Sequence, residues 1–274
     1  LSWVVAPVFN EYKTVDLQAP ANAVLLDEAR MKFTIILSVL ALLAVVAYFI
    51  CFRNTRELVP RGISKVSIKA TLSMVGSNKP LLILCAAAFF LLFAQFTFNA
   101  VAMYYASYVL GDASWFTLLA LAQAIGTIII ASFVPAITAK VGKRAGYMGI
   151  AAVAVLSYVV IYLVPAQVPS TSTTSSLVVA LIGWFLFGGG AGGTNALMFA
   201  MQADTVDYGE WRTGTRSEGG SYSILSFLRK CGQGLGGFLG AAVIGAYGYG
   251  QQGRSPVADA EIIQGIRVAT GLVP

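Results

Sequence analysis

The segment Gln202–Gly240 reads QADTVDYGEWRTGTRSEGGSYSILSFLRKCGQGLGGFLG and places ionisable residues both beside and inside apolar sequence. Its first part is densely polar, whereas its second part is apolar but contains Arg229 and Lys230. Long hydrophobic segments flank it on both sides. Because an ionisable residue inside a membrane is costly and usually serves a function, this segment indicates a functional site within a membrane protein.

The composition of the chain supports this reading. Of its 274 residues, 57% are hydrophobic and 11% are charged, and the mean hydropathy is +0.76. Soluble domains contain about 25% charged residues, so the sequence predicts an integral membrane protein. The absence of histidine excludes Ser-His-Asp hydrolysis, histidine-ligated zinc and histidine proton relays. The net charge of +6 does not indicate nucleic-acid binding, because the basic residues cluster in loops between apolar segments.

Six apolar runs are long enough to cross a bilayer as helices, which requires about 20 residues each. They cover residues 33–52, 81–109, 115–139, 147–164, 177–201 and 221–247. The polar residues 11–32 are predicted to form an extramembrane loop, and residues 248–274 are too polar to cross. The sequence therefore predicts an all-α membrane protein in three parts: the end of one bundle (1–52), a basic connector (53–80) and a second bundle (81–274).

The distribution of basic residues predicts the sidedness of these spans. Lys and Arg occur at 53–79, 140–144 and 212–216, whereas the loops at 107–114 and 165–176 have none. By the positive-inside rule, the first set of loops is cytoplasmic. The last predicted span then ends outside, and we expect further helices before Leu1 and after Pro274. A connector between two bundles is typical of transporters that bind substrate between repeats.

Lys230 is the leading candidate for substrate binding. If its helix begins near Ser221, Lys230 lies about 13 Å along it, close to mid-membrane. Ser226 and Gln233 are expected on the same face. Arg229 is expected to extend toward the cytoplasm and to contribute to coupling. The structural alternative for Lys230 is a buried ion pair with an acidic residue of another helix.

Two further polar residues interrupt the span that begins at residue 81. Gln95 and Asn99 are four residues apart and therefore share a helix face. Substrate contact and interhelical hydrogen bonding explain them about equally well.

Two glycine patterns have different interpretations. The run Gly188–Gly193 formally matches G-x-G-x-x-G, but it lacks the strand that a dinucleotide site requires. It is interpreted as a flexible or broken helix near the candidate substrate residue Asn195. Gly232, Gly236 and Gly240 repeat at every fourth position, which predicts close helix packing.

The polar patch is interpreted as a cytoplasmic gate or latch. Its charged residues are Asp204, Asp207, Glu210, Arg212, Arg216 and Glu218. The first three acids are expected to pair with the basic connector or with the loop at 140–144. Such exposed pairs contribute only about 0–1 kcal/mol each, so several would have to act together.

At these residues the sequence resembles the glycoside–pentoside–hexuronide:cation symporters, a branch of the major facilitator superfamily. The resemblance rests on ADTVDYGEWRTGTRSEG (203–219) and SFLRKCGQGLGG (226–237). It extends to YYASYVLGD (104–112), AKVGKRAGY (139–147) and IQGIRVATGLVP (263–274). Within the family, the RKCGQ run looks most like bacterial glucuronide permeases; melibiose permease is a more distant relative.

The resemblance implies a major-facilitator-type helix bundle of twelve helices, of which this chain would hold roughly helices six to eleven. Lys230 matches a helix-eleven lysine that family members require for coupled sugar transport. Ser226 and Asn195 match sugar-facing positions, and Asn99 matches a helix-seven asparagine. The acids of the cation site are expected in the first four helices, outside this chain.

The implied function is symport of a sugar, glycoside or hexuronide with H⁺ or Na⁺ by alternating access, without a further cofactor or metal. The protein is expected to be a monomer in the inner (plasma) membrane, with a small-molecule substrate and lipid as partners. Two alternatives stay open: a transporter-like sugar sensor and a cation-coupled lipid symporter. An enzyme is disfavoured, because no nucleophile–base pair is evident.

Overall fold

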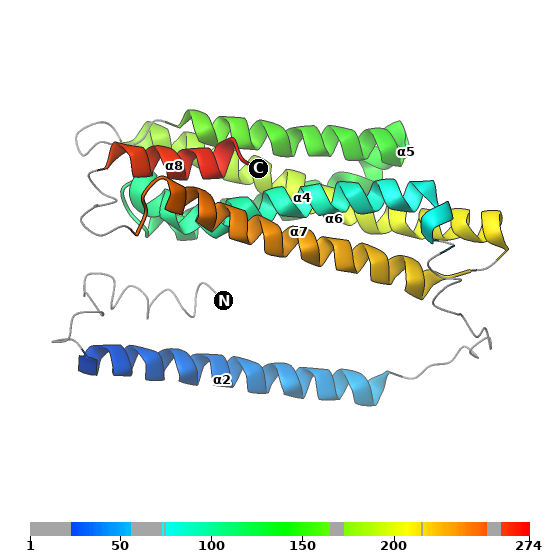
Figure 1. Cartoon of the computed structure of the whole chain (residues 1–274), viewed down its shortest axis with the longest axis horizontal. Coiled ribbons are helices and arrows are strands. Elements are labelled where there is room, and N and C mark those ends of the chain that lie inside the picture. Colours follow the sequence, from blue (N-terminus) through cyan, green and yellow to red (C-terminus); the bar gives the residue numbers. More distant parts are fainter. Residues whose placement is uncertain (1–22, 56–72, 74, 165–172, 215, 251–258) are drawn as a thin grey trace. The chain divides into compact units, whose positions relative to one another are not determined.

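The computed structural model describes residues 23–55, 73, 75–164, 173–214, 216–250 and 259–274 (Figure 1). The chain divides into two compact units, residues 1–65 and 66–274. The division falls within the predicted connector, most of which lies outside the described residues. The boundaries of the two predicted bundles stay a prediction, and each unit is described by itself.

In the first unit the structure describes one helix, α2 (Ala23–Asn54). It contains the predicted span 33–52 and begins ten residues earlier, so the prediction of a loop is wrong for residues 23–32. Salt bridges from Arg30 to Asp27 (3.4 Å) and from Lys32 to Glu28 (3.0 Å) join charges on neighbouring turns. Such pairs stabilise a helix, so a charged sequence is not necessarily a loop. Residues 11–22 lie outside the described residues.

The second unit begins with α4 (Lys79–Tyr104), which continues into the π-helical turn η2 (Tyr105–Val109). Asn78 caps α4 by accepting a hydrogen bond from the Leu81 backbone N–H (3.1 Å), and Pro80 lies in the first turn. The Asn78 side chain also donates to the Thr205 carbonyl (2.7 Å), which fixes the start of α4 against the helix that contains Thr205.

Helix α5 (Trp115–Leu163) contains two of the predicted spans. As one straight helix, its 49 residues would extend about 74 Å, more than twice the apolar thickness of a bilayer. The backbone leaves the helical conformation at Gly142, with φ 81° and ψ 161°. A positive φ of this size favours glycine, so Gly142 divides α5 into two arms, as the predicted spans require.

The remaining helices are α6 (Thr173–Thr213), α7 (Glu218–Ala246) and α8 (Ala260–Gly271). Helix α6 continues through the polar patch as far as Thr213, beyond the predicted span. At 12 residues, α8 is too short to cross a membrane, yet Ile262, Ile266 and Ala269 are buried in the core. In the described part of the chain, α2, α4 with η2, α5 and α6 have both the length and the hydropathy of membrane spans. The predicted helical membrane fold is confirmed.

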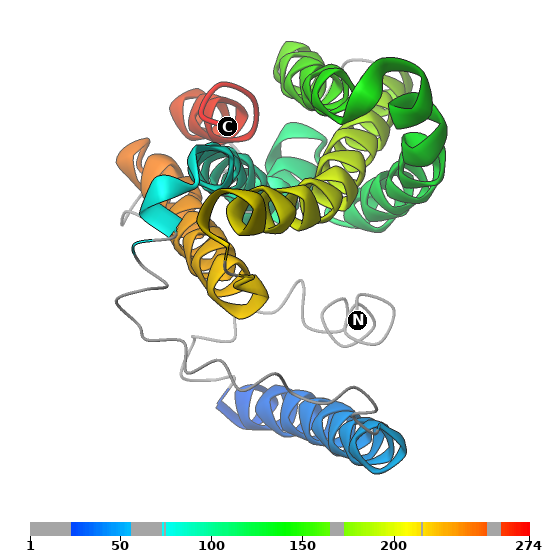
Figure 2. The same ribbon diagram turned by 90° about the vertical axis from the view of Figure 1, so that its right-hand side faces the viewer.

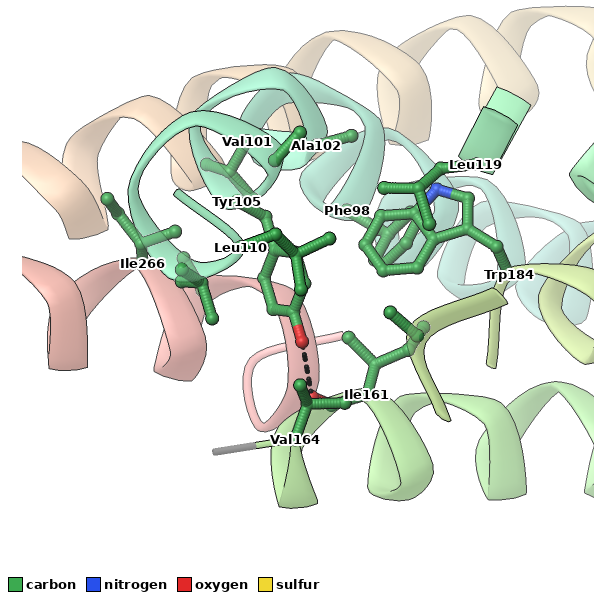
Figure 3. Packing of buried hydrophobic residues seen from close by; sticks show 14 of the residues in the cluster. Phe98, Val101, Ala102, Tyr105, Leu110, Leu119, Ile161, Val164, Trp184 and Ile266 are labelled. Atoms are coloured by element: carbon green, nitrogen blue, oxygen red, sulfur yellow. Dashed lines mark hydrogen bonds between the residues drawn. The ribbon is translucent and has the colours of Figure 1, made fainter. Parts of the chain in front are cut away.

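The main core lies between α4, η2, α5, α6 and α8 and is rich in aromatic residues (Figure 3). The ring of Trp184 lies 4.9 Å from that of Phe98 and 5.0 Å from that of Tyr105, centroid to centroid. The Tyr105 hydroxyl donates to the Ile161 carbonyl (2.9 Å), so this buried polar group is satisfied.

Glycines allow α7 to lie directly against α4 (Figures 1 and 2). A Cβ atom added at Gly232, Gly236 or Gly240 would come closer than 3.0 Å to a backbone oxygen of α4, at Phe89, Phe93 and Thr97 respectively. The Thr97 hydroxyl donates to the Gly236 carbonyl (3.0 Å) across the same contact. The predicted packing role of this glycine stripe is therefore confirmed.

The second glycine run has a packing role as well, which corrects its interpretation as a broken helix. Helix α6 is continuous through Gly188–Gly193 and lies along both arms of α5 (Figure 2). A Cβ atom at Gly188 would collide with the Gln123 carbonyl of the first arm, and one at Gly190 would collide with Ala154 of the second. The Thr127 hydroxyl donates to the Gly188 carbonyl (2.9 Å). These residues keep α6 close to α5 rather than interrupting it.

We predict that Gly236→Ala destabilises the protein, because its methyl group would collide with the Phe93 backbone. Overpacking of this kind costs roughly 1–3 kcal/mol. Gly234→Ala is the matched control, since no atom lies within 4 Å of its added Cβ. Thermal unfolding of the purified full-length protein should show a lower Tm for Gly236→Ala than for Gly234→Ala. Equal Tm values would contradict the packing role of the stripe.

Candidate functional site

Gln95 of α4 and Asn195 of α6, two of the predicted substrate residues, lie together. The Asn195 side-chain N–H donates to Gln95 Oε1 (3.5 Å) and to the Ala191 carbonyl (2.8 Å). Gln95 is only 8% exposed, and its Nε2 has no hydrogen-bond partner within the described structure. An unsatisfied buried amide costs about 1–3 kcal/mol, so this N–H₂ group is an unused donor in the contact between α4 and α6.

Asn99 lies one turn beyond Gln95 on the same helix. The structure exposes Asn99 and buries Gln95, so the two residues share a face but not an environment. Only Gln95 joins the amide pair with Asn195.

Lys230 lies about 18 Å along α7 from Glu218, at about 1.5 Å per residue. Its side chain is exposed on the second unit, and Nζ donates to Gln233 Oε1 (3.0 Å). The predicted grouping of Lys230 with Gln233 is therefore present. Half-buried Ser226 lies one turn earlier on α7. No ion pair of Lys230 occurs among the described residues, so the alternative of an ion pair within this chain finds no support there.

Arg229 was expected to extend toward the cytoplasm, but its side chain packs against α6. Its Nη1 donates to the Met198 sulfur (3.1 Å), and its guanidinium carbon lies 4.9 Å from the centre of the Phe199 ring. The side chain is half-buried as a result. Met198 and Phe199 were not foreseen from the sequence, since a hydrophobic residue within a span does not reveal its partner.

Charged residues at the predicted cytoplasmic end form two groups. In the first, Lys143 Nζ lies 2.7 and 2.8 Å from the two carboxylate oxygens of Asp204. This confirms the predicted pairing of Asp204 with the loop at 140–144. The reversal of the chain at Gly142 places Lys143 at the start of the second arm of α5, where it reaches α6.

The second group is centred on Arg216, between α6 and α7. Its guanidinium contacts Glu210 (2.7 Å), Glu218 (2.7 Å) and Asp207 (2.9 Å). Asp207 and Glu210 therefore pair with Arg216 rather than with the 140–144 loop, and their pairing with the basic connector stays a prediction, because connector residues 56–72 lie outside the described residues. Hydrogen bonds to Glu210, Glu218 and Asp207 raise the pKa of Arg216 above its ordinary value.

Arg212, assigned to the same latch, lies outside the Arg216 group and donates to the Tyr208 hydroxyl (3.2 Å). Within the described part of the chain, no group of three His, Cys, Asp or Glu residues could hold a metal ion. Asn78, which connects α4 to α6, was also missed, although an Asn shortly before Pro80 is a helix-start signal.

Two cavities lie beside these groups. One, of about 760 Å³, lies between α4, the second arm of α5 and α6 and is mainly apolar. The Lys143–Asp204 pair is among the residues that line it. The other, of about 480 Å³, lies between α6 and α7. Its lining includes Phe199, Gln202, Val206, Arg216, Glu218 and Tyr222. The second cavity therefore connects the Arg216 group with the aromatic ring on which Arg229 lies.

We predict that Lys143 and Asp204 are energetically coupled, because they are the only described ion pair that joins α5 to α6. Exposed pairs of this kind contribute about 0.2–1 kcal/mol. A double-mutant cycle with Lys143→Ala and Asp204→Ala, followed by thermal unfolding, should give a coupling of that size. The control cycle replaces Lys143→Ala with Lys140→Ala and should give none. Equal coupling in the two cycles would show that the effect is only long-range charge.

Known proteins resemble this chain over most of its length. The sequence profile of a family described as "MFS/sugar transport protein" matches residues 10–274. The "Glucuronide carrier protein homolog" of Escherichia coli (strain K12) is 39% identical over 238 residues, which cover 86% of this chain and 50% of that protein.

Two further relatives are more distant. The "Isoprimeverose transporter" of Lactiplantibacillus pentosus is 31% identical over 213 residues, or 77% of this chain and 43% of that protein. The "Uncharacterized symporter YjmB" of Bacillus subtilis (strain 168) is 28% identical over 259 residues, or 90% of this chain and 52% of that protein. The chain therefore spans about half the length of the curated relatives it matches.

Proposed function

Because the chain belongs to the MFS/sugar transport protein family, we propose that it is part of a secondary transporter that moves a sugar, glycoside or hexuronide together with a cation. The family is one of transport proteins rather than enzymes, as the sequence led us to expect. The similarity to proteins named as a glucuronide carrier homologue and an isoprimeverose transporter supports a sugar-like substrate. The coupling cation in this proposal is H⁺ or Na⁺.

The observation that carries the proposal is the environment of Lys230. Its ammonium group is exposed on α7, about 18 Å along that helix from Glu218. It donates to the Gln233 side-chain oxygen rather than to a described carboxylate. A lysine at that depth is tolerated where it faces water, a ligand or a counter-charge. A sugar hydroxyl or carboxylate in a central, water-filled pathway would meet this requirement. Ser226, on the preceding turn, would contribute a further hydrogen bond.

The amide pair on α4 and α6 would form another part of the same site. Gln95 Nε2 is a buried donor without a partner in the described structure, and Asn195 holds its oxygen. Sugars present many hydroxyl oxygens that can accept such a bond. Asn99, exposed one turn away, would be a further contact.

The charged groups at the other end of these helices would act as a cytoplasmic latch in alternating access. The Arg216 group has three carboxylates and one guanidinium, which leaves two negative charges in excess. An excess of this sign would attract the basic connector when the cytoplasmic side closes. Salt would weaken that attraction, because the groups are exposed.

The protein as a whole is a multi-pass membrane protein. The inner (plasma) membrane is its proposed location and a monomer its proposed state, with lipid around the bundle.

We predict that Lys230→Ala in the full-length protein abolishes gradient-driven accumulation of a labelled glycoside in vesicles, because it removes the donor that faces the substrate. Lys230→Arg should restore little, since a planar fork cannot replace a compact ammonium group. Gel filtration and membrane insertion should be unchanged, and Lys140→Ala, a change at an exposed residue near the end of the first arm of α5, should transport normally.

Accumulation by Lys230→Ala at the wild-type rate would disprove the site assignment. Wild-type protein that binds the glycoside without moving it would instead indicate the sensor. Preference for a labelled lipid over every glycoside would indicate the lipid symporter.

A further inference from the structure

Arg229 is a charged side chain within the α6–α7 contact whose described partners are both uncharged. Its guanidinium donates to the Met198 sulfur and lies over the Phe199 ring. No ion pair of Arg229 occurs among the described residues. A guanidinium has five N–H donors, and a thioether is a weak acceptor for one of them. Most of the hydrogen-bonding capacity of this half-buried group is therefore unused.

Two other arginines of the same unit have oxygen partners. Arg216 contacts three carboxylates. Arg267 of α8 donates to the Tyr162 carbonyl (2.8 Å) and to Gln264 Oε1 (3.3 Å), although its buried Nε has no partner in the described structure. Arg229 has neither kind of oxygen partner in the described structure, so its remaining N–H groups can donate to an oxygen acceptor from outside the protein.

The cavity between α6 and α7 shares Phe199 with the Arg229 contact, although Arg229 is not among its lining residues. Phe199, on which Arg229 lies, and Tyr222, two helical turns before it on α7, both line that cavity of about 480 Å³. Their side chains are 46% and 54% exposed. A ligand that contacts Phe199 in this cavity would therefore lie beside the ring on which the guanidinium rests. The adjacent Lys230 adds a second positive charge at nearly the same depth.

We propose that Arg229 binds the oxyanion of an anionic sugar, such as the carboxylate of a hexuronide or the sulfonate of a sulfo-sugar. This inference rests on the proposed function and assigns to Arg229 a role in substrate selection rather than in gating. The planar fork of arginine binds two oxygens of one oxyanion side by side, which a lysine cannot do. A glucuronide, the compound in the name of the Escherichia coli relative, has such a carboxylate.

The test uses equilibrium binding to the purified full-length protein, with a phenyl glucuronide and the matching phenyl glucoside as ligands. Arg229→Met should raise the Kd for the glucuronide by about 10- to 150-fold, the range expected for losing a hydrogen bond to a charged group. The Kd for the glucoside should change by less than about 3-fold, a margin well below that range. Arg229→Lys should fall between the wild type and Arg229→Met, and Lys140→Met, a matched loss of charge, should equal the wild type.

A sulfonated glucoside of the same aglycone separates the two oxyanions. Binding that depends on Arg229 for both anions supports a general oxyanion subsite, whereas dependence for one of them identifies the preferred substrate. If neither variant at Arg229 weakens the binding of any anion, the proposal is wrong.

Equal loss of glucuronide and glucoside binding would show that Arg229 stabilises the fold or pairs with a carboxylate of the protein, and would overturn the proposal. If Arg229→Met fails to fold, Arg229→Lys is measured instead. A larger rise in the Kd of the glucuronide than in that of the glucoside would support the proposal, and equal changes would overturn it. Because binding does not require transport, a protein that binds the glucuronide through Arg229 but does not move it would refute the transporter and retain the anion subsite. Wild-type protein that binds no anionic sugar would refute the subsite.

Discussion

Contact between the backbones of α7 and α4 is the constraint on which the arrangement of the candidate site depends. Gly236 lies so close to the Phe93 carbonyl that no side chain fits between them, and Thr97 adds a hydrogen bond to the Gly236 carbonyl. This face of α7 is fixed against α4. Arg229 therefore lies where α7 meets α6, and Lys230 lies on an exposed face of α7. The glycine stripe thus positions charges that are not part of it.

The same principle applies to α6 and α5. Glycines of the 188–193 run bring α6 against both arms of α5, and Asn195, on the next turn, then meets Gln95 of α4. Close packing without side chains leaves little room to adjust, so polar groups on these helices are held in place rather than mobile. A site built on such helices can present an unpaired amide or guanidinium to a ligand, because close packing limits local adjustment that would satisfy it.

The sequence predicted the long helices, the turn between the two arms of α5 and the pairing of Asp204 with the 140–144 loop, because hydrophobic length and opposite charge are local signals. The predicted span 221–247 forms α7, which is not among the described helices with the hydropathy of a membrane span. It did not predict which way a glycine run would act, since Gly188–Gly193 is compatible with a break or with close packing until its neighbours are known. The partners of Arg216 were missed for a related reason: several exposed charges lay within reach of one another, and sequence gives no distances. The roles of the candidate site residues stay a prediction, because they are defined by contacts with a substrate.

The central claim is that the face of α7 bearing Ser226 and Lys230 meets the substrate, and cysteine labelling at Ser226 tests it most directly. Ser226→Cys would be introduced into full-length protein whose native cysteines, including Cys51, Cys85 and Cys231, are replaced. A water-soluble thiol reagent should label position 226, and a bound glucuronide should slow that labelling. The control, Leu235→Cys, lies on another face of α7 and should react at a rate that the sugar does not change. Labelling at position 226 that is equally fast with and without every sugar tested would contradict the account.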